Sequence, residues 1–371
     1  MRDVEIGHLR LALRLAARGR YTAYPNPMVG AVVTDRGGRR IGRGYHHAPG
    51  QAHAEVAAFA ESGRARGGTL YVTLEPCSHH GRTPPCIDAV VASGVGRVVA
   101  CHADPDFRVR GRGLRALRDA GIEVAVGPLA REAVRLNLRY LVEKVEARPM
   151  VTLKWAQSLD GKIATASGES QWISSPKGRQ WALALREEHD AILVGSGTAL
   201  ADDPSLDRRL GLAPGPNVRV VLDRRLRVTS RARLLTVDGP VIIYTESGNE
   251  RRIAGLRSRG VRVARRKVWT LRSVLRDLHR LGVGSVLVEG GAQVLGGFVA
   301  AGEFDRVEVC TAPKLIGGGG APGPIAGSGV AKLADAPRIE AMRTGRRGPD
   351  RVMSGVREGL LDHLLVELGG A

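Results

Sequence analysis

A chain of 371 residues with 43% hydrophobic and 25% charged residues is long enough for two domains, each with its own core. No apolar run approaches the roughly 18 residues of a membrane-spanning helix, and the charged N-terminus does not resemble a signal peptide. The net charge of +19 could indicate nucleic acid or small phosphorylated ligands as partners. The basic residues are spread along the chain, as a GC-rich genome would also produce, and the aromatic content of 4% offers little for base stacking. We therefore expect neither a nucleic-acid nor a membrane partner.

The first part of the chain alternates helix-like and strand-like segments. Ile6, Leu9 and Leu13 lie on one helical stripe, which Gly19 ends. The pattern predicts further helices at residues 53–62, 86–93, 114–120 and 131–143, and strands at 29–33, 69–74, 97–101 and 122–126. Such alternation predicts a sheet with helices on both faces.

Residues 146–149 have the composition of a linker, so we expect two domains, at residues 1–147 and 148–371. A second alternating series follows the linker. Its expected strands are residues 150–154, 191–194, 219–222, 241–244, 285–288 and 306–311, and its expected helices are 176–188, 270–281 and 292–301. Residues 341–359 are rich in Arg and Gly without apolar periodicity, which predicts a flexible loop before a last strand at 364–368.

Two segments of the first domain have the composition of a metal site. His53-Ala54-Glu55 begins an expected helix, and Cys77 and Cys86 flank a polar loop after an expected strand. One imidazole and two thiolates are three ligands for a tetrahedral Zn²⁺ with an open fourth position, and Glu55 is a base that can move protons there. His53 and Glu55 can share a target only beyond the helix end, and Cys86 in a first helical turn favours a thiolate.

One alternative to this zinc site is a set of separate buried cysteines near a surface His-Ala-Glu. His79 or His80 could also ligate zinc, but their position in the middle of a polar loop favours substrate contacts or solvation. Zinc nucleobase deaminases have a His-x-Glu and Pro-Cys-x-x-Cys signature. Eight residues separate Cys77 from Cys86 here, which argues against a tRNA or cytidine deaminase. Cys101 and Cys310 lie in apolar runs and are expected to be core thiols, which favours a reducing, cytoplasmic location.

Motifs along nearly the whole chain resemble the family of bifunctional riboflavin-biosynthesis deaminase/reductases. They are Asn26-Pro-Met-Val-Gly30, His53-Ala-Glu55, Glu75-Pro-Cys-Ser-His-His-Gly-Arg-Thr-Pro-Pro-Cys86, Lys154-Trp-Ala-Gln-Ser-Leu-Asp-Gly-Lys-Ile-Ala164, Ser167-Gly-Glu-Ser-Gln-Trp-Ile173, Ala201-Asp-Asp-Pro204, Val288-Glu-Gly-Gly291 and Ala312-Pro-Lys-Leu315. The resemblance implies an α/β protein with an N-terminal three-layer cytidine-deaminase-like domain and a C-terminal dihydrofolate-reductase-like domain. It implies zinc-dependent deamination of 2,5-diamino-6-(5-phosphoribosylamino)pyrimidin-4-one, followed by NADPH-dependent reduction of the ribosyl group to ribityl. It also implies a homo-oligomer.

The resemblance also implies site residues. The metal ligands would be His53, Cys77 and Cys86, and Glu55 would be catalytic. The cofactor residues would be Ala156, Trp172, Thr198, Asp202, Gly291, Ala292, Gln293, Val294, Leu295, Gly296 and Gly297, and the substrate residues Ser170, Arg186, Leu206, Arg209 and Glu289.

Physical reasoning about the second domain leaves alternatives open. Gly290-Gly291 follows a strand and opens a helix, where backbone N–H groups can hold a pyrophosphate, but a full Gly-x-Gly-x-x-Gly fingerprint is absent. Arg186 and Arg209 suit a phosphate, and Glu289 suits ribose hydroxyls. Without the resemblance, Arg186 would be read as a solvated helix residue and Trp172 as a core residue.

Three features depart from the family pattern. Asp207 adds a carboxylate beside the expected phosphate site, Arg224 replaces a small hydroxyl residue near the cofactor, and the segment 345–361 is long. The competing hypotheses are a nucleic-acid (tRNA) base deaminase with an inactive accessory domain, and a binding protein with one inactive half.

Overall fold

The computed structural model describes residues 3–106 and 109–369, which form two compact units. Of the described residues, those up to 146 and those from 361 to 369 form one unit, and residues 147–360 form the other. The division falls at the expected linker, whereas residues 361–369, which were expected in the second domain, pack with the first unit. Among the described helices, none is long and apolar enough to cross a membrane.

The first unit is built on a five-stranded sheet of order β2-β1-β3-β4-β5. β1 pairs antiparallel with β2 and β3, and β3, β4 and β5 are parallel. The strands are β1 (Gly30–Thr34), β2 (Arg40–Tyr45), β3 (Thr69–Val72), β4 (Arg97–Ala100) and β5 (Glu123–Val126). The helices are α1 (Asp3–Ala16), a short 3₁₀ turn (Ala17–Gly19), α2 (Ala54–Ser62), α3 (Cys86–Ser93), α4 (Arg112–Asp119), α5 (Ala130–Leu136), α6 (Leu138–Glu146) and α12 (Leu360–Glu367).

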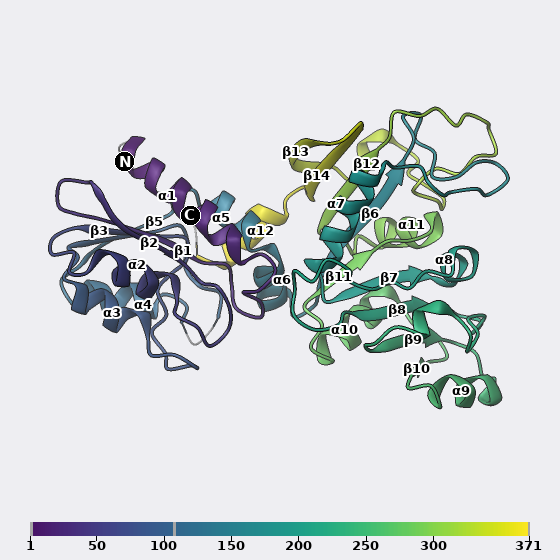
Figure 1. Ribbon diagram of the computed structural model, residues 1–371, viewed down its shortest axis with the longest axis horizontal. Helices are drawn as coiled ribbons and strands as arrows, with labels where there is room; N and C mark the ends of the chain where they lie inside the picture. Colours follow the sequence, from purple (N-terminus) through teal and green to yellow (C-terminus); the bar gives the residue numbers. More distant parts are fainter. Residues whose placement is uncertain (1–2, 107–108, 370–371) are drawn as a thin grey trace. The chain divides into compact units, whose positions relative to one another are not determined.

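Side chains that alternate along these strands form two cores, one on each face of the sheet. Val32, Tyr71 and Val99 pack against α1 and α5, whereas Val33 and Val98, with their neighbours, pack against α2, α3 and α4. Figure 1 shows α1 on one side of the sheet and α2, α3 and α4 on the other. This is the expected three-layer arrangement, because a period of two sends successive side chains to opposite faces.

Strand β2 was not predicted, because its sequence Arg-Ile-Gly-Arg-Gly-Tyr has little apolar content. The glycines are required by close packing: a Cβ at Gly44 would lie 2.4 Å from the carbonyl oxygen of Ala54 in α2. The strand therefore has small residues where a sequence pattern expects β-branched ones.

The second unit contains a nine-stranded sheet of order β10-β9-β8-β7-β11-β6-β12-β14-β13. The first seven strands in this order are parallel, and β14 and β13 add an antiparallel edge. The strands are β6 (Met150–Gln157), β7 (Ala191–Gly195), β8 (Val218–Leu222), β9 (Val241–Thr245), β10 (Arg262–Arg265), β11 (Ser285–Val288), β12 (Arg306–Thr311), β13 (Ile339–Arg347) and β14 (Asp350–Arg357). The helices are α7 (Pro176–Glu187), α8 (Ser196–Asp202), α9 (Glu250–Arg257), α10 (Leu271–Arg280) and α11 (Ala292–Ala301), with 3₁₀ turns at Arg233–Leu235 and Leu333–Asp335.

Two predictions near the C-terminus are wrong. The expected flexible loop at 341–359 is largely the hairpin β13–β14, in which arginines of the edge strand β13 face solvent and no apolar alternation is needed. The expected strand at 364–368 is part of helix α12, with Leu360, Leu361 and Leu364 buried. A short apolar run does not distinguish a strand from a helix by its periodicity.

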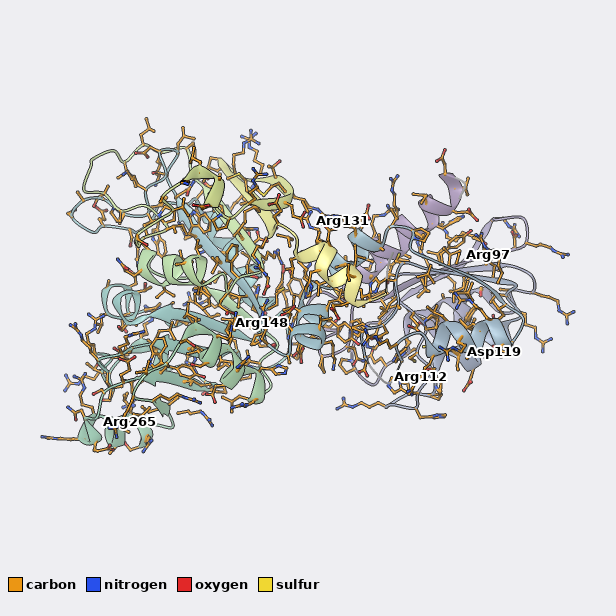
Figure 2. All side chains as sticks on the ribbon, turned by 180° about the vertical axis from the view of Figure 1, so that it is seen from behind. Arg97, Arg112, Asp119, Arg131, Arg148 and Arg265 are labelled. Carbon is orange, nitrogen blue, oxygen red and sulfur yellow. The ribbon has the colours of Figure 1, made fainter. Side chains whose placement is uncertain are left out.

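Among the residues that the structure describes, arginines occur throughout both units. Figure 2 labels Arg97 and Arg112 in the first unit and Arg148 and Arg265 in the second. Some of them carry structural ion pairs: Arg148 donates to both carboxylate oxygens of buried Asp305 at 2.7 Å.

Candidate active sites

Three metal-binding side chains of the first unit come from two helix starts and an adjoining loop. His53 is the N-cap of α2, Cys86 is the first residue of α3, and Cys77 lies in the loop after β3. His53 Nδ1 is 3.0 Å from Cys86 Sγ and 3.5 Å from Cys77 Sγ, and the three ligand atoms lie within 4.8 Å of one another. Ligands of tetrahedral zinc are about 3.5–3.8 Å apart, so the donor set and its spacing fit zinc. No other such group of His, Cys, Asp and Glu occurs among the described residues.

The electrostatics of this cluster suit metal binding and proton transfer. The pKa of Cys77 is lowered to about 4, first by hydrogen bonding with the Cys86 thiol and then by the His53 imidazole and the Cys86 backbone N–H, although burial opposes this. Glu55 is 3% exposed, and its pKa is raised to about 7 by burial and by the charge of Cys77. A carboxyl group with a pKa near neutrality can both accept and release a proton.

A cavity of about 360 Å³ borders His53, Cys77 and Glu55. This is within the usual size range of small-molecule sites. His79 lines the cavity, whereas His80 is exposed and does not, so neither belongs to the metal-binding group. Polar and charged residues form much of the remaining wall: Asn26, His46, Glu75, Arg82, Thr83, Asp104, Asp106, Tyr140 and Lys144.

The buried carboxylate of Glu75 holds one wall of this cavity in place. It accepts backbone N–H groups from Asp104, Gly111, Gly113 and Leu114 at 2.9–3.2 Å. It thereby ties the segment before Cys77 to the loop between β4 and α4, which carries Asp104 to the cavity. Neither carboxylate was predicted from the sequence to have a role. Their positions after two expected strands could have indicated such a role, since the carboxyl ends of adjacent parallel strands, here β3 and β4, meet at one edge of the sheet.

His46 and Asn26 form a further polar contact on the cavity wall. His46 is buried, its Nδ1 donates to the carbonyl of Ala52 at 3.2 Å, and its Nε2 lies 2.9 Å from the Asn26 amide. The imidazole is therefore a neutral tautomer that accepts from Asn26, and burial lowers its pKa. The wall presents a fixed pattern of hydrogen-bonding groups to a ligand.

In the second unit, the predicted cofactor residues come from the ends of neighbouring parallel strands. Ala156 lies in β6, Thr198 follows β7 in α8, and Gly291 is the N-cap of α11 after β11. A Cβ on Gly291 would lie 3.0 Å from Thr198 Oγ1, so these two segments touch. The rest of the predicted cofactor segment, up to Gly297, forms the first turns of α11.

Other predicted residues of the second unit form pairs. Burial raises the pKa of the Asp202 carboxyl. A hydrogen bond with the Ser170 hydroxyl opposes this effect only in part. Trp172 is 60% exposed, so the alternative of a core tryptophan is wrong. Leu206, in contrast, is 1% exposed and belongs to the core beside α8 and α9.

The two arginines predicted to bind phosphate are engaged by carboxylates. Arg186 donates from Nε and a terminal nitrogen to Glu289 at 2.7 and 2.8 Å, so it is not a solvated helix residue. Arg209 lies 3.0 Å from Asp207 and also donates to Ser205. The Asp207 carboxylate, which adds negative charge beside the expected phosphate site, is therefore paired with Arg209.

A second cavity of about 420 Å³ lies where β8 ends and α11 begins. Arg224 stacks on the Trp269 indole at 4.7 Å and lies 3.3 Å from Glu246, while Arg227 donates to the Ser196 hydroxyl at 2.8 Å. The cavity is lined by Ser196, Leu222, Arg224, Arg225, Arg227, Trp269, Thr270, Leu271, Gln293, Val294 and Gly297. It joins predicted cofactor residues to three arginines, of which only Arg224 was singled out from the sequence.

Fold and sites together define a fused enzyme with a zinc-deaminase unit and a reductase unit. The family model described as the cytidine and deoxycytidylate deaminase zinc-binding region matches residues 4–102, and that of the RibD C-terminal domain matches residues 149–353. The chain belongs to the RibD family of riboflavin biosynthesis proteins, as the sequence motifs predicted.

Individual relatives cover almost the whole chain. The riboflavin biosynthesis protein RibD of Aquifex aeolicus is 41% identical over 95% of this chain and 98% of its own length. RibD of Escherichia coli is 41% identical over 92% of this chain and 96% of its own. The solved structure of Acinetobacter baumannii RibD superposes with a TM-score of 0.82 at 34% identity, covering 96% of this chain and 99% of that one.

The chain therefore acts in riboflavin biosynthesis as a bifunctional deaminase and reductase, and its two domains imply zinc and NADPH as cofactors. This reading is favoured over a nucleic-acid base deaminase with an inactive accessory domain. The predicted α/β fold with two different domains is confirmed.

Proposed function

We propose that the first unit hydrolytically deaminates 2,5-diamino-6-(5-phosphoribosylamino)pyrimidin-4-one and that the second reduces the ribosyl group of the product to ribityl with NADPH. The observation that carries the first step is the buried carboxyl of Glu55 beside the His53, Cys77 and Cys86 triangle, in a cavity of small-molecule size. In support, a similar solved structure from Thermotoga maritima, at 34% identity and a TM-score of 0.82, is that of a diaminohydroxyphosphoribosylaminopyrimidine deaminase/5-amino-6-(5-phosphoribosylamino)uracil reductase.

The deamination step follows from the protonation chemistry of Glu55. Zinc, when bound by His53, Cys77 and Cys86, lowers the pKa of its water ligand towards neutrality. The Glu55 carboxylate takes one proton from the attacking water and delivers it to the ring nitrogen. It then takes the second proton of that water and delivers it to the amine, which leaves as ammonia. Its raised pKa supports both halves of this transfer. The polar cavity wall orients the pyrimidine, and Arg82 and Lys144 are cations on that wall that suit a phosphate.

For the reduction step, NADPH binds along the ends of β6, β7 and β11, with its phosphates near the start of α11. The arginines of the second cavity suit the 2′-phosphate that distinguishes NADPH from NADH. The Trp269 indole, which also lines this cavity, stacks with the Arg224 guanidinium. Arg209 anchors the substrate phosphate by exchanging its Asp207 partner for the phosphate oxygens.

The decisive experiment incubates the chain with the diaminopyrimidine phosphate, with and without NADPH, and follows ammonia release and NADPH oxidation separately. We expect Glu55→Gln to retain zinc and lose ammonia release by about 10²–10⁴-fold, because ligation and proton transfer use different residues. Asp119→Asn, at the exposed end of α4 (Figure 2), is the matched control. Normal ammonia release by Glu55→Gln would defeat the assignment.

The reductase half is tested by two arginine variants. Arg224→Ala should raise the KM for NADPH about tenfold and leave that for NADH unchanged, whereas Arg257→Ala, on the exposed side of α9, should change neither. Arg209→Ala should raise the substrate KM more than it lowers kcat, since a phosphate anchor acts equally in ground and transition states. A pure kcat loss would contradict that role.

We further propose a cytoplasmic, homo-oligomeric enzyme. All four cysteines are free thiols, two of them in the metal site, which supports a reducing compartment. Sedimentation of the purified chain would test the assembly.

A further inference from the structure

The loop between Cys77 and Cys86 supplies a third contact to the zinc cluster besides its two thiols. Thr83 Oγ1 lies 3.2 Å from His53 Nε2. The other ring nitrogen, Nδ1, faces Cys86 Sγ at 3.0 Å and Cys77 Sγ at 3.5 Å. The imidazole is therefore held between the two sulfur atoms on one side and the threonine hydroxyl on the other.

This arrangement selects one tautomer of His53. A ligating nitrogen must be unprotonated, so ligation through Nδ1 requires the ring proton on Nε2, where it can be donated to Thr83 Oγ1. Metal-bound histidines usually donate their second N–H to an oxygen acceptor, which fixes the ring orientation and raises the basicity of the ligating nitrogen.

The loop sequence explains how the hydroxyl arrives at this place. Thr83 is followed by Pro84 and Pro85, whose fixed φ angles give a stiff connection to Cys86 at the start of α3. On the other side, the backbone N–H of Gly81 donates to the Thr83 carbonyl at 3.2 Å. Cys86 and Thr83 therefore approach His53 as one unit.

We propose that Thr83 is a positioning residue for the metal site: its hydroxyl accepts the Nε2–H of His53 and holds Nδ1 in the orientation that binds zinc. This inference rests on the proposed zinc-dependent function and assigns part of the eight-residue loop to zinc affinity. Thr83 also lines the cavity, so the competing role is a direct contact to substrate.

The test measures zinc affinity directly in the full-length chain. Metal is removed with a chelator, and Zn²⁺ is titrated back in competition with a chromogenic chelator. Thr83→Val keeps the side-chain shape and removes the hydroxyl, so we expect its zinc affinity to fall about 10–100-fold. Thr83→Ser restores an acceptor and should bind zinc within about threefold of the natural chain. Ser78→Ala removes a hydroxyl from the same loop and is the matched control.

The outcomes separate this inference from the proposed function. Unchanged zinc affinity in Thr83→Val, with or without a raised KM for substrate, overturns the positioning role and leaves the deaminase assignment standing. If Thr83→Ser loses as much zinc affinity as Thr83→Val, the positioning role is also overturned. If the natural chain itself binds no zinc, the proposed zinc-dependent deaminase function is wrong. Far-ultraviolet circular dichroism of the metal-free variants checks the fold, and Thr83→Ala gives the same comparison if the valine variant does not fold.

Discussion

The ion pair between Arg186 and Glu289 allows a stability prediction with a calculable size. Both side chains are largely buried, at 13% and 9% exposure, and they make two parallel hydrogen bonds. Although burial raises the pKa of Glu289, the charges of Arg186 and Lys154 lower it from 4.5 to about 2. A shift of this size corresponds to about 3 kcal/mol of stability. Removing one partner of a buried pair typically costs about 3–5 kcal/mol.

We therefore expect Glu289→Gln to destabilise the second unit by about 3 kcal/mol at pH 7, because Arg186 keeps its charge in a buried place. The double variant Arg186→Met/Glu289→Gln should lose less than the sum of the two single variants. All four tryptophans, at positions 155, 172, 181 and 269, lie in the second unit, so urea unfolding followed by tryptophan fluorescence reports on that unit alone.

The pH dependence gives an independent check. Glu289 has a folded-state pKa below its unfolded one, so its contribution is present above about pH 4.5 and is lost as pH falls towards 2. Glu289→Gln should remove this part of the acid dependence. A change below about 0.5 kcal/mol at pH 7, or additive effects in the double variant, would refute the reasoning.

Three further predictions concern other contacts. A Cβ on Gly113 would lie 2.1 Å from a backbone carbonyl oxygen, so Gly113→Ala should cost about 2 kcal/mol in calorimetry of the first unit, whereas Gly7→Ala, with open space around it, should not destabilise. Asp207→Asn should lower the reductase KM for its phosphorylated substrate about threefold by releasing Arg209; an unchanged or higher KM would argue against competition for that guanidinium. Burial raises the pKa of Asp104 from 3.8 to about 6, so the free energy of unfolding of the first unit should fall by up to about 3 kcal/mol as pH rises from about 4 to 6. Asp104→Asn should abolish this fall in stability. If the fall persists in the variant, another group causes it.

The deaminase site could be predicted because its residues lie next to prolines and helix starts, which are recognisable in the sequence. Cys86 follows two prolines and begins α3, and His53 caps α2 two residues before Glu55. Prolines and helix starts are encoded locally, so the direction of these side chains can be inferred before the fold is known. The family motifs then selected the reaction.

The supporting contacts depend on residues that are distant in the sequence. Glu75 is satisfied by backbone groups up to 39 positions away, and Thr83 reaches His53 across 30 positions. Neither partner can be read from spacing. The Glu75 contacts require the ends of β3 and β4 to meet in the parallel sheet, and the Thr83 contact requires the loop before α3 to pack against the start of α2.

The sequence by itself indicated a boundary near residue 147, the three-layer first unit and a His, Cys, Cys group that fits zinc, since hydrophobic periodicity and motif spacing act over short distances. Only the tertiary structure decided that Arg186 is paired with Glu289, that three arginines and Trp269 share a cavity, that 341–359 contains a hairpin and that α12 packs with the first unit. These features depend on charge burial, backbone pairing at a sheet edge and long-range packing, and each requires the partner surface to be in place before its energy is gained.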